Sequence, residues 1–319
     1  MSEAAAPELR GSVLITHGFG EHAGRYQKFA ERVSKAGFDV YRFDLEAHGR
    51  QAMAASATGV AESGAAARTA GAAARGDAAA STASGRQDGE APASESQSQN
   101  ARIQAARDHG TVNVARLIAQ HLRARQEVLR QCRSRELCLF GHSLGGLVTL
   151  ASSILDPTNI RAVTVTAPAL LPNPHVSKFT AKLGRLTAPF FPRRGTVAIN
   201  PEEISSDQDE VRAYVEDPLV FHGKVPLLTA SSMLTQGRRV LDNAGLTLVP
   251  TLVLHSPQDQ ICRFEGSRQF VEQAKGHEEA GISVQLREVK PAKHDLLHET
   301  YTIREEVIVQ ILNWYQQWA

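Results

Sequence analysis

Residues Leu137–Leu150 read LCLFGHSLGGLVTL and place one serine, Ser143, between glycines directly after an apolar run. The run Glu136–Gly141 has the content of a buried strand, and the residues after Ser143 continue with the apolar spacing of a helix. Between a strand and a helix, the pattern G-x-S-x-G exposes the serine hydroxyl on a tight turn. Ser143 is therefore either a nucleophile or an ordinary helix N-cap, and its companions elsewhere in the chain distinguish the two.

Strands and helices alternate on both sides of this stretch. Short apolar runs predict further strands at Ser12–Gly18, Phe38–Asp44 and Ile160–Pro168. A helical spacing of apolar residues separates the first two, and a last helix is expected at 301–318. This alternation predicts the α/β class, with a mostly parallel sheet covered by helices on both faces.

Two segments interrupt the alternation. Residues 52–100 contain 18 Ala, 7 Ser and 6 Gly, and because such a composition buries too little surface to offset the entropy of ordering, we expect a disordered insert. A proline-rich segment with helical patches predicts a cap between two strands. The expected order is core at 8–50, insert at 51–106, core with the nucleophile at 107–168, cap at 169–245, and core with the acid and base at 246–319.

Composition excludes several classes of function. The 319 residues carry a formal net charge of +1, so the chain lacks the basic field typical of nucleic-acid binding. Three scattered cysteines (Cys132, Cys138, Cys262) predict a reducing compartment. The start MSEAAAPELRG lacks the features of a signal peptide, and no window approaches 18 consecutive apolar residues. We expect a cytoplasmic protein that binds no nucleic acid and uses no metal or cofactor.

A serine nucleophile needs a base to take its proton and a carboxylate to orient that base. On an α/β sheet the three groups follow the chain order Ser, acid, His, each after a strand. TLVLHSPQDQ supplies Asp259, and VQLREVKPAKHDLLHE supplies His294. Asp295 is a poor rival for the acid, because it is adjacent to His294 in the chain. Order and context together favour the nucleophile.

The same mechanism needs backbone donors for an oxyanion. The N–H of Leu144, directly after the nucleophile, is one candidate. The other is the N–H of Phe19, which lies between glycines in THGFGEH after an early strand.

The motifs HGFGEHAGRY, GHSLGGLV, VEDPLV, HSPQDQIC and KHDLLHE together resemble the monoacylglycerol lipase family of α/β-hydrolases, over about residues 10–50 and 110–319. The resemblance implies a capped serine hydrolase that releases a fatty acid and glycerol. It implies a triad of Ser143, Asp259 and His294, with Phe19 and Leu144 as the oxyanion hole. It further implies that a polar set binds the glycerol group: Glu21, Arg25, Tyr214 and His298.

Two positions add detail to the resemblance. Cys262 matches a cysteine that some members carry near the site; the alternative is a small buried hydrophobic residue. The family's usual D-x-x-G-H-G stretch is DLEAHGR here, with Ala47 in place of the glycine.

The segment HVSKFTAKLGRLTAPFFPRRG suggests contact with a membrane or lipid droplet through the cap. Apolar residues recur there at spacings of three and four, with basic neighbours, which suits an interfacial helix. The alternative is that the apolar stripe packs inward over the acyl pocket. The apolar residues are Val176, Phe179, Leu183, Leu186 and Phe190, and the basic ones are Lys178, Lys182, Arg185, Arg193 and Arg194.

Other functions remain as alternatives. The same triad serves a lysophospholipase or a broad carboxylesterase. A catalytically silent binding scaffold would have no need of all three groups. HDLLH places His294 and His298 four apart, as in a zinc signature, but lacks its glutamate. The sequence thus predicts hydrolysis of a monoacylglycerol or a similar single-chain lipid ester.

Overall fold

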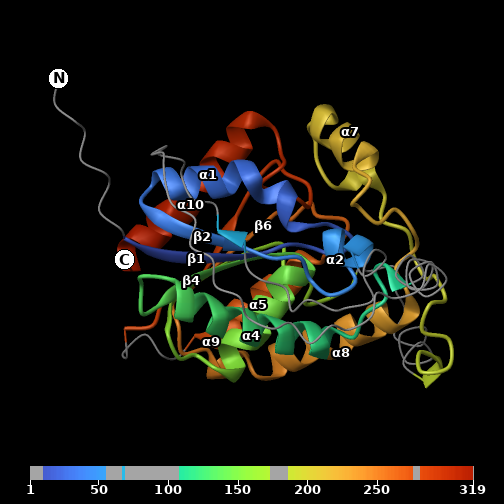
Figure 1. Cartoon of the computed structure of the whole chain (residues 1–319), viewed down its shortest axis with the longest axis horizontal. Helices are drawn as coiled ribbons and strands as arrows, with labels where there is room; N and C mark the ends of the chain where they lie inside the picture. Colours follow the sequence, from blue (N-terminus) through green and yellow to red (C-terminus); the bar gives the residue numbers. More distant parts are fainter. Residues whose placement is uncertain (1–9, 55–66, 69–107, 173–185, 276–280, 319) are drawn as a thin grey trace, which may run out of the picture.

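The computed structural model describes residues 10–54, 67–68, 108–172, 186–275 and 281–318. Its centre is a seven-stranded sheet with the order β3-β2-β1-β4-β5-β6-β7 (Figure 1). Only β3 runs antiparallel to its neighbour among these strands, which confirms the mostly parallel sheet. The strands are β1 (Gly11–Thr16), β2 (Phe38–Arg42), β3 (Ala67–Arg68), β4 (Leu137–His142), β5 (Ile160–Thr166), β6 (Thr251–His255) and β7 (Val284–Glu288).

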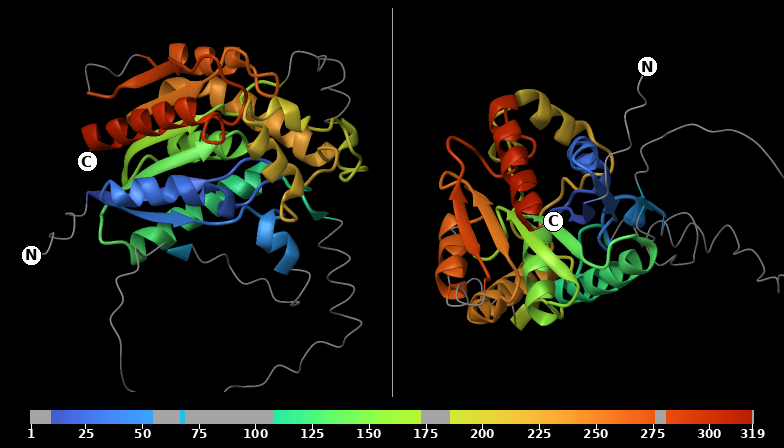
Figure 2. Two further views of the ribbon diagram at one scale, coloured as in Figure 1. Left: turned by 90° about the horizontal axis from the view of Figure 1, so that it is seen from above. Right: turned by 90° about the vertical axis from the view of Figure 1, so that its left-hand side faces the viewer.

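Helices cover both faces of the sheet, as the alternation predicts (Figure 2). One face is covered by α1 (Gln27–Lys35) and α10 (Tyr301–Trp318), and the other by α4 (Val114–Gln131), α5 (Leu144–Leu155), α8 (Leu227–Asp242) and α9 (Phe264–Ala274). No helix within the described ranges is both long enough and apolar enough to cross a membrane.

The strand β4 lies at the centre of the sheet and is buried along its whole length. Most residues of the helix α5 that follows are buried as well. The turn between β4 and α5 is therefore anchored by a buried element on each side. The carboxyl ends of parallel strands meet at one edge of a sheet. The turn after β4 and the loops after β6 and β7 are therefore brought to the same edge.

The chain between β5 and β6 forms the predicted helical cap. The cap contains η2 (Pro201–Glu203) and α7 (Gln208–Glu216). The predicted range 169–245 also includes α8 and the start of η3 (Ala244–Leu246), but α8 packs against α4, α5 and α9 on the face of the sheet. The cap is attached to the loop after β1: the Phe221 N–H donates to the Gly20 carbonyl at 2.7 Å, and the rings of Phe19 and Phe221 meet edge to face at 5.8 Å. His22, before the short helix η1 (Ala23–Tyr26), reaches Asp217 of the cap at 2.8 Å.

Most of the predicted insert, 55–66 and 69–106, lies outside the described residues. Within its described part, two short elements differ from the expected disorder: α2 (Gly49–Ala54), which extends into the insert, and β3, which adds an antiparallel edge to β2.

Ala47 has a φ of 59°, in the left-handed region that favours glycine. The glycine that the family uses at this position is therefore explained by the backbone, and alanine is strained there.

Candidate active site

Ser143 occupies the sharp turn between β4 and α5 with a φ of 50° and a ψ of −114°. Non-glycine residues are rarely found in such a conformation, and it persists only where the surroundings impose it. Here the Ser143 N–H donates to the Thr166 carbonyl, and its own carbonyl accepts from Ala169, both at 3.0 Å. The Ser143 side chain makes no capping hydrogen bond to α5. The ordinary N-cap interpretation is therefore wrong.

The glycines beside Ser143 are required by close backbone contacts. A Cβ at Gly141 would lie 2.5 Å from the carbonyl oxygen of Gly145. A Cβ at Gly145 would lie 2.3 Å from the carbonyl oxygens of Thr16 and His17. Only glycine fits at either position. The tight packing of the backbone around the turn therefore explains both glycines of the G-x-S-x-G pattern.

Asp259 and His294, predicted from chain order, are in contact. His294 Nδ1 donates to Asp259 Oδ2 at 2.6 Å, and both side chains are buried. The backbone N–H groups of Ile261 and Cys262 donate to Asp259 Oδ1 at 2.7 and 3.0 Å. Because an ionised carboxylate only accepts, the His294 proton lies on Nδ1 and its Nε2 keeps the lone pair of a base.

The charges of this pair reinforce each other. Burial raises the pKa of Asp259, but the adjacent His294 charge and the hydrogen bonds from His255 and His294 outweigh it, and the pKa falls below its usual range. Burial lowers the pKa of His294, but the Asp259 carboxylate, aided by Asp295 and Glu21, raises it above the usual 6.5. The pair is thus built to stabilise an imidazolium at His294.

Cys262 and His142 link this pair to the serine. Ser143 Oγ lies 4.0 Å from Cys262 Sγ, while the Cys262 N–H binds Asp259. The ring of His142, next to Ser143 in the chain, lies 4.9 Å from the ring of His294. Burial raises the pKa of the Cys262 thiol well above its usual value, so the sulfur stays protonated. The structure brings all three predicted groups to one edge of the sheet.

Both predicted oxyanion donors adjoin this turn. Leu144 is the first residue of α5, and the first N–H groups of a helix have no acceptor within it. Phe19 follows Gly18, whose added Cβ would lie 3.4 Å from Ser143 Cβ. The cap fixes the Phe19 loop through Phe221, as described above.

The four residues proposed for a glycerol group also come together, in a buried cluster beside the turn. The Arg25 guanidinium lies 5.1 Å above the Tyr214 ring and 3.7 Å from carboxylate oxygens of both Glu21 and Asp295. His298 donates to Asp295 Oδ2 at 2.7 Å. Three atoms of the cluster have no hydrogen-bond partner among the described residues: Arg25 Nε, Arg25 Nη2 and Asp295 Oδ1. The cluster therefore contains two buried donors that are ion-paired but not hydrogen-bonded, and one acceptor without a donor.

The zinc interpretation of HDLLH does not fit this geometry. His298 faces acceptors with both ring nitrogens, Asp295 Oδ2 at 2.7 Å and the Arg25 carbonyl at 3.0 Å. Burial lowers the pKa of His298, but the Asp295 charge raises it above its usual value. An imidazolium that donates from both nitrogens keeps no lone pair for a metal.

Carboxylate and imidazole atoms of Glu21, His142 and Asp295 lie within 4.8 Å of one another and are spaced closely enough for a cation. The guanidinium of Arg25 already lies against both carboxylates. Arg25 and His298 together supply the positive charge that balances them.

The roles of two residues in this site were not predicted: His255 was not considered, and Asp295 was considered only as a rival acid. His255, at the end of β6, donates to Asp259, and Asp295 organises the polar cluster. The signal for His255 was its position four residues before the acid.

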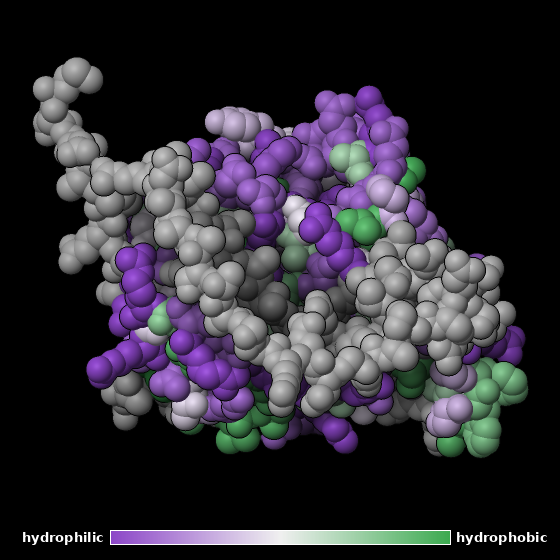
Figure 3. Space-filling view, in the orientation of Figure 1, coloured by the Kyte–Doolittle hydropathy of each residue, from purple (hydrophilic) through white to green (hydrophobic). Residues whose placement is uncertain are grey.

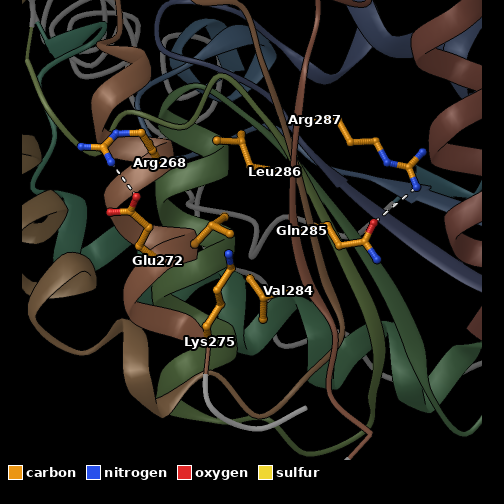
Figure 4. A pocket seen from close by; sticks show the side chains of 8 residues that line it. Arg268, Glu272, Lys275, Val284, Gln285, Leu286 and Arg287 are labelled. Carbon is orange, nitrogen blue, oxygen red and sulfur yellow. Dashed lines mark hydrogen bonds and ion pairs between the residues drawn. The ribbon is translucent and has the colours of Figure 1, made fainter.

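A separate hollow of about 540 Å³ lies between α9 and β7 at the edge of the sheet (Figure 4). Its lining includes Arg268, which pairs with Glu272, and Arg287, which contacts Gln285. None of the predicted site residues lines it.

Comparison with known proteins gives a consistent result. A family profile described as serine aminopeptidase, S33 matches residues 7–69 and 96–301. A monoacylglycerol lipase of Mycolicibacterium smegmatis is 26% identical over 300 residues, which cover 94% of this chain and 85% of that protein.

Solved structures share the fold. The monoacylglycerol lipase of Paleococcus ferrophilus has a TM-score of 0.69 at 24% identity, covering 98% of this chain and 96% of its own. A soluble variant of monoglyceride lipase from Saccharomyces cerevisiae, in complex with a substrate analog, has a TM-score of 0.71 at 18% identity, with coverages of 99% and 89%.

Proposed function

The chain belongs to the serine aminopeptidase, S33 family, and on this premise we propose that it is a serine hydrolase that cleaves the ester bond of a monoacylglycerol. One observation carries the proposal: His294, hydrogen-bonded to Asp259 at 2.6 Å, has its ring 4.9 Å from the ring of His142, which immediately precedes the strained Ser143. The M. smegmatis relative, which is named a monoacylglycerol lipase, supports the choice of substrate.

The reaction follows from the roles of the three groups. His294 Nε2 takes the Ser143 proton while Oγ attacks the ester carbonyl carbon, and Asp259 stabilises the resulting imidazolium. The N–H groups of Phe19 and Leu144 bind the oxyanion, and one such donor contributes about 3–4 kcal/mol. The C–O bond to glycerol then breaks, and His294 gives its proton to the leaving oxygen. Water, deprotonated by His294, releases the fatty acid, and the proton returns to Ser143.

The buried polar cluster supports glycerol as the leaving group. Arg25 Nε and Nη2 are ion-paired at 3.7 Å but make no hydrogen bond, and Asp295 Oδ1 accepts none, so these atoms match the hydroxyls of a neutral polyol. Glu21, Tyr214 and His298 complete the wall of this binding site. A zwitterionic phosphocholine group would have to lose the hydration of both its charges there, while the charges of Arg25 and His298 are already paired with Glu21 and Asp295, which is costly.

The proposal is tested with four substrates: a monoacylglycerol, a lysophosphatidylcholine, a short p-nitrophenyl ester and an aminoacyl p-nitroanilide. We expect the monoacylglycerol to give the highest kcat/KM. Preference for the lysophospholipid or the short ester would support the lysophospholipase or carboxylesterase alternative instead. Preference for the anilide would support a peptidase, and no turnover of any substrate would favour the silent scaffold.

The pH dependence of kcat/KM is expected to show an acid limb with a midpoint above 6.5. The base must be neutral in the free enzyme, and the Asp259 carboxylate raises the pKa of His294 above that value. Activity is therefore lost as the pH falls through the raised pKa. Monoacylglycerol has no ionisable group, so the limb belongs to the enzyme. A midpoint below 6.5 would contradict the assignment of His294 as the base.

We propose further that the cap docks on the membrane or droplet surface that holds the substrate. Leu186, Phe190 and Phe191 are exposed by 66%, 76% and 56%, and Arg194 follows them. Figure 3 shows apolar atoms gathered at the lower right, at the cap end of the molecule. Arg193 is paired with Asp108 at 2.6 Å. The rest of the apolar stripe, Val176, Phe179 and Leu183, lies outside the described residues.

Replacing both Phe190 and Phe191 by serine is expected to lower flotation with anionic liposomes by about 100-fold, since burying one such ring contributes about 1.5–3 kcal/mol. Leu155→Ser is the matched control, because Leu155 is 67% exposed at the end of α5, outside the cap. Equal flotation of the double variant and the control would exclude docking through these residues.

The cytoplasmic location predicted from the sequence is part of this proposal. The thiols of Cys132, Cys138 and Cys262 are all free, which is consistent with a reducing compartment.

A further inference from the structure

His255 is a fully buried histidine that the mechanism above does not use. It ends β6 and is 0% exposed. Its Nε2 lies 3.0 Å from Asp259 Oδ2, and its Nδ1 lies 2.7 Å from the hydroxyl of Ser267 on α9. Since the carboxylate only accepts, Nε2 carries the proton. In the neutral ring, Nδ1 then accepts from the Ser267 hydroxyl.

The Asp259 carboxylate thus receives four hydrogen bonds, two on each oxygen. The backbone N–H groups of Ile261 and Cys262 hold Oδ1. Oδ2 accepts hydrogen bonds from both His255 and His294. Because His294 lies on a loop, it is the group that needs to be oriented and cannot itself fix the carboxylate.

His255 is attached to more rigid structure. It ends the strand β6, which is paired on both sides, with β5 and β7. Its ring meets Phe264 edge to face at 5.7 Å, and its second nitrogen contacts Ser267 on the helix α9. Sites supported from strands and helices are more precise than sites on loops. The chain Ser267–His255–Asp259–His294 therefore runs without a gap from α9 to the base.

We propose that His255 is a positioning residue, whose Nε2–H fixes the Asp259 oxygen that orients His294. The inference rests on the proposed function, because it assigns Asp259 as the catalytic acid. It differs from a purely structural role, in which His255 would only satisfy buried polar groups. A structural role changes stability, whereas a positioning role also changes turnover and its pH dependence.

The substitutions His255→Gln and His255→Asn distinguish the hydrogen bond to Asp259 from the hydrogen bond to Ser267. Glutamine places its amide where Nε2 was and can still donate to Asp259, whereas asparagine places its amide where Nδ1 was and can reach only Ser267. His121→Asn is the matched control, because His121 is also 0% exposed and binds a serine, Ser152, at 2.8 Å, outside the candidate site.

We expect His255→Asn to lower kcat by about 100-fold, as misplacement of a catalytic group by about 1 Å can do. We expect its acid limb to move to higher pH, because Asp259 without this donor attracts the His294 proton more strongly. The other groups that face His294, namely Asp295, Glu21 and His142, are unchanged in this variant. His255→Gln should recover wild-type kcat to within about fivefold.

The measurements are kcat/KM against pH, the rate of labelling by a fluorophosphonate, and thermal unfolding. If His255→Asn does not fold, Ser267→Ala replaces it, with an expected loss of about fivefold and the same direction of shift. An unchanged acid limb with a loss no larger than that of His121→Asn would overturn the inference. Failure of the wild type on every ester would instead overturn the proposed function, so the two failures are distinct.

Discussion

Ser143→Ala is expected to lower kcat for monoacylglycerol by about six orders of magnitude, since in a serine hydrolase the loss of the nucleophile removes the whole covalent route. The residual rate over water comes from the oxyanion donors and substrate binding. The fold should persist, because the Ser143 side chain caps no helix. Alanine also keeps the two backbone hydrogen bonds of residue 143, to Thr166 and from Ala169.

The matched control is Ser153→Ala. Ser153 is a buried serine on the same helix, and its hydroxyl donates to the Leu150 carbonyl at 2.9 Å. The control is expected to retain wild-type turnover. If Ser143→Ala kept activity within tenfold of the wild type, another group would have to be the nucleophile.

Asp259→Asn is expected to lower kcat by about four orders of magnitude. The amide keeps the shape of the side chain but places an N–H group opposite His255 or His294. His294 then takes the wrong tautomer, with its proton on Nε2, and cannot accept the serine proton. The amide nitrogen cannot accept the hydrogen bonds that one Asp259 oxygen accepts, so the thermal transition should also fall, and activity is compared at a temperature at which both proteins are folded.

The acid limb of kcat/KM gives a second readout for Asp259→Asn. Without the carboxylate, the main cause of the raised pKa of His294 is removed, so the midpoint should move to lower pH. The control is Asp209→Asn, whose carboxylate is 87% exposed on α7 and pairs with Arg212. Comparable activity in the two variants would exclude Asp259 as the acid.

The fold was predictable because its strands and helices have clear periodicity. The last helix, expected at 301–318, is observed as α10, Tyr301–Trp318. The edge strand β3 was not predicted, since two residues in an alanine-rich segment carry no periodic signal. The strain at Ala47 was not predictable either, because the φ angle is known only from the structure of the backbone.

The candidate triad was predictable from chain order, because parallel strands bring successive loops to one edge of the sheet. Its supporting residues were not. Asp295 is adjacent to His294 in the chain, yet its carboxylate faces His298 and Arg25. His255 lies four residues before Asp259, but this spacing alone does not establish the contact, which depends on the side-chain directions at the end of β6.

The central claim is that Ser143 is an activated nucleophile, and covalent labelling tests it most directly. The protein is treated with a fluorophosphonate probe, with and without EDTA, and the labelled peptide is identified by mass. The account predicts a single label on Ser143 at a rate that EDTA does not change. A folded protein that takes no label on Ser143, or loses its label with EDTA, would contradict it.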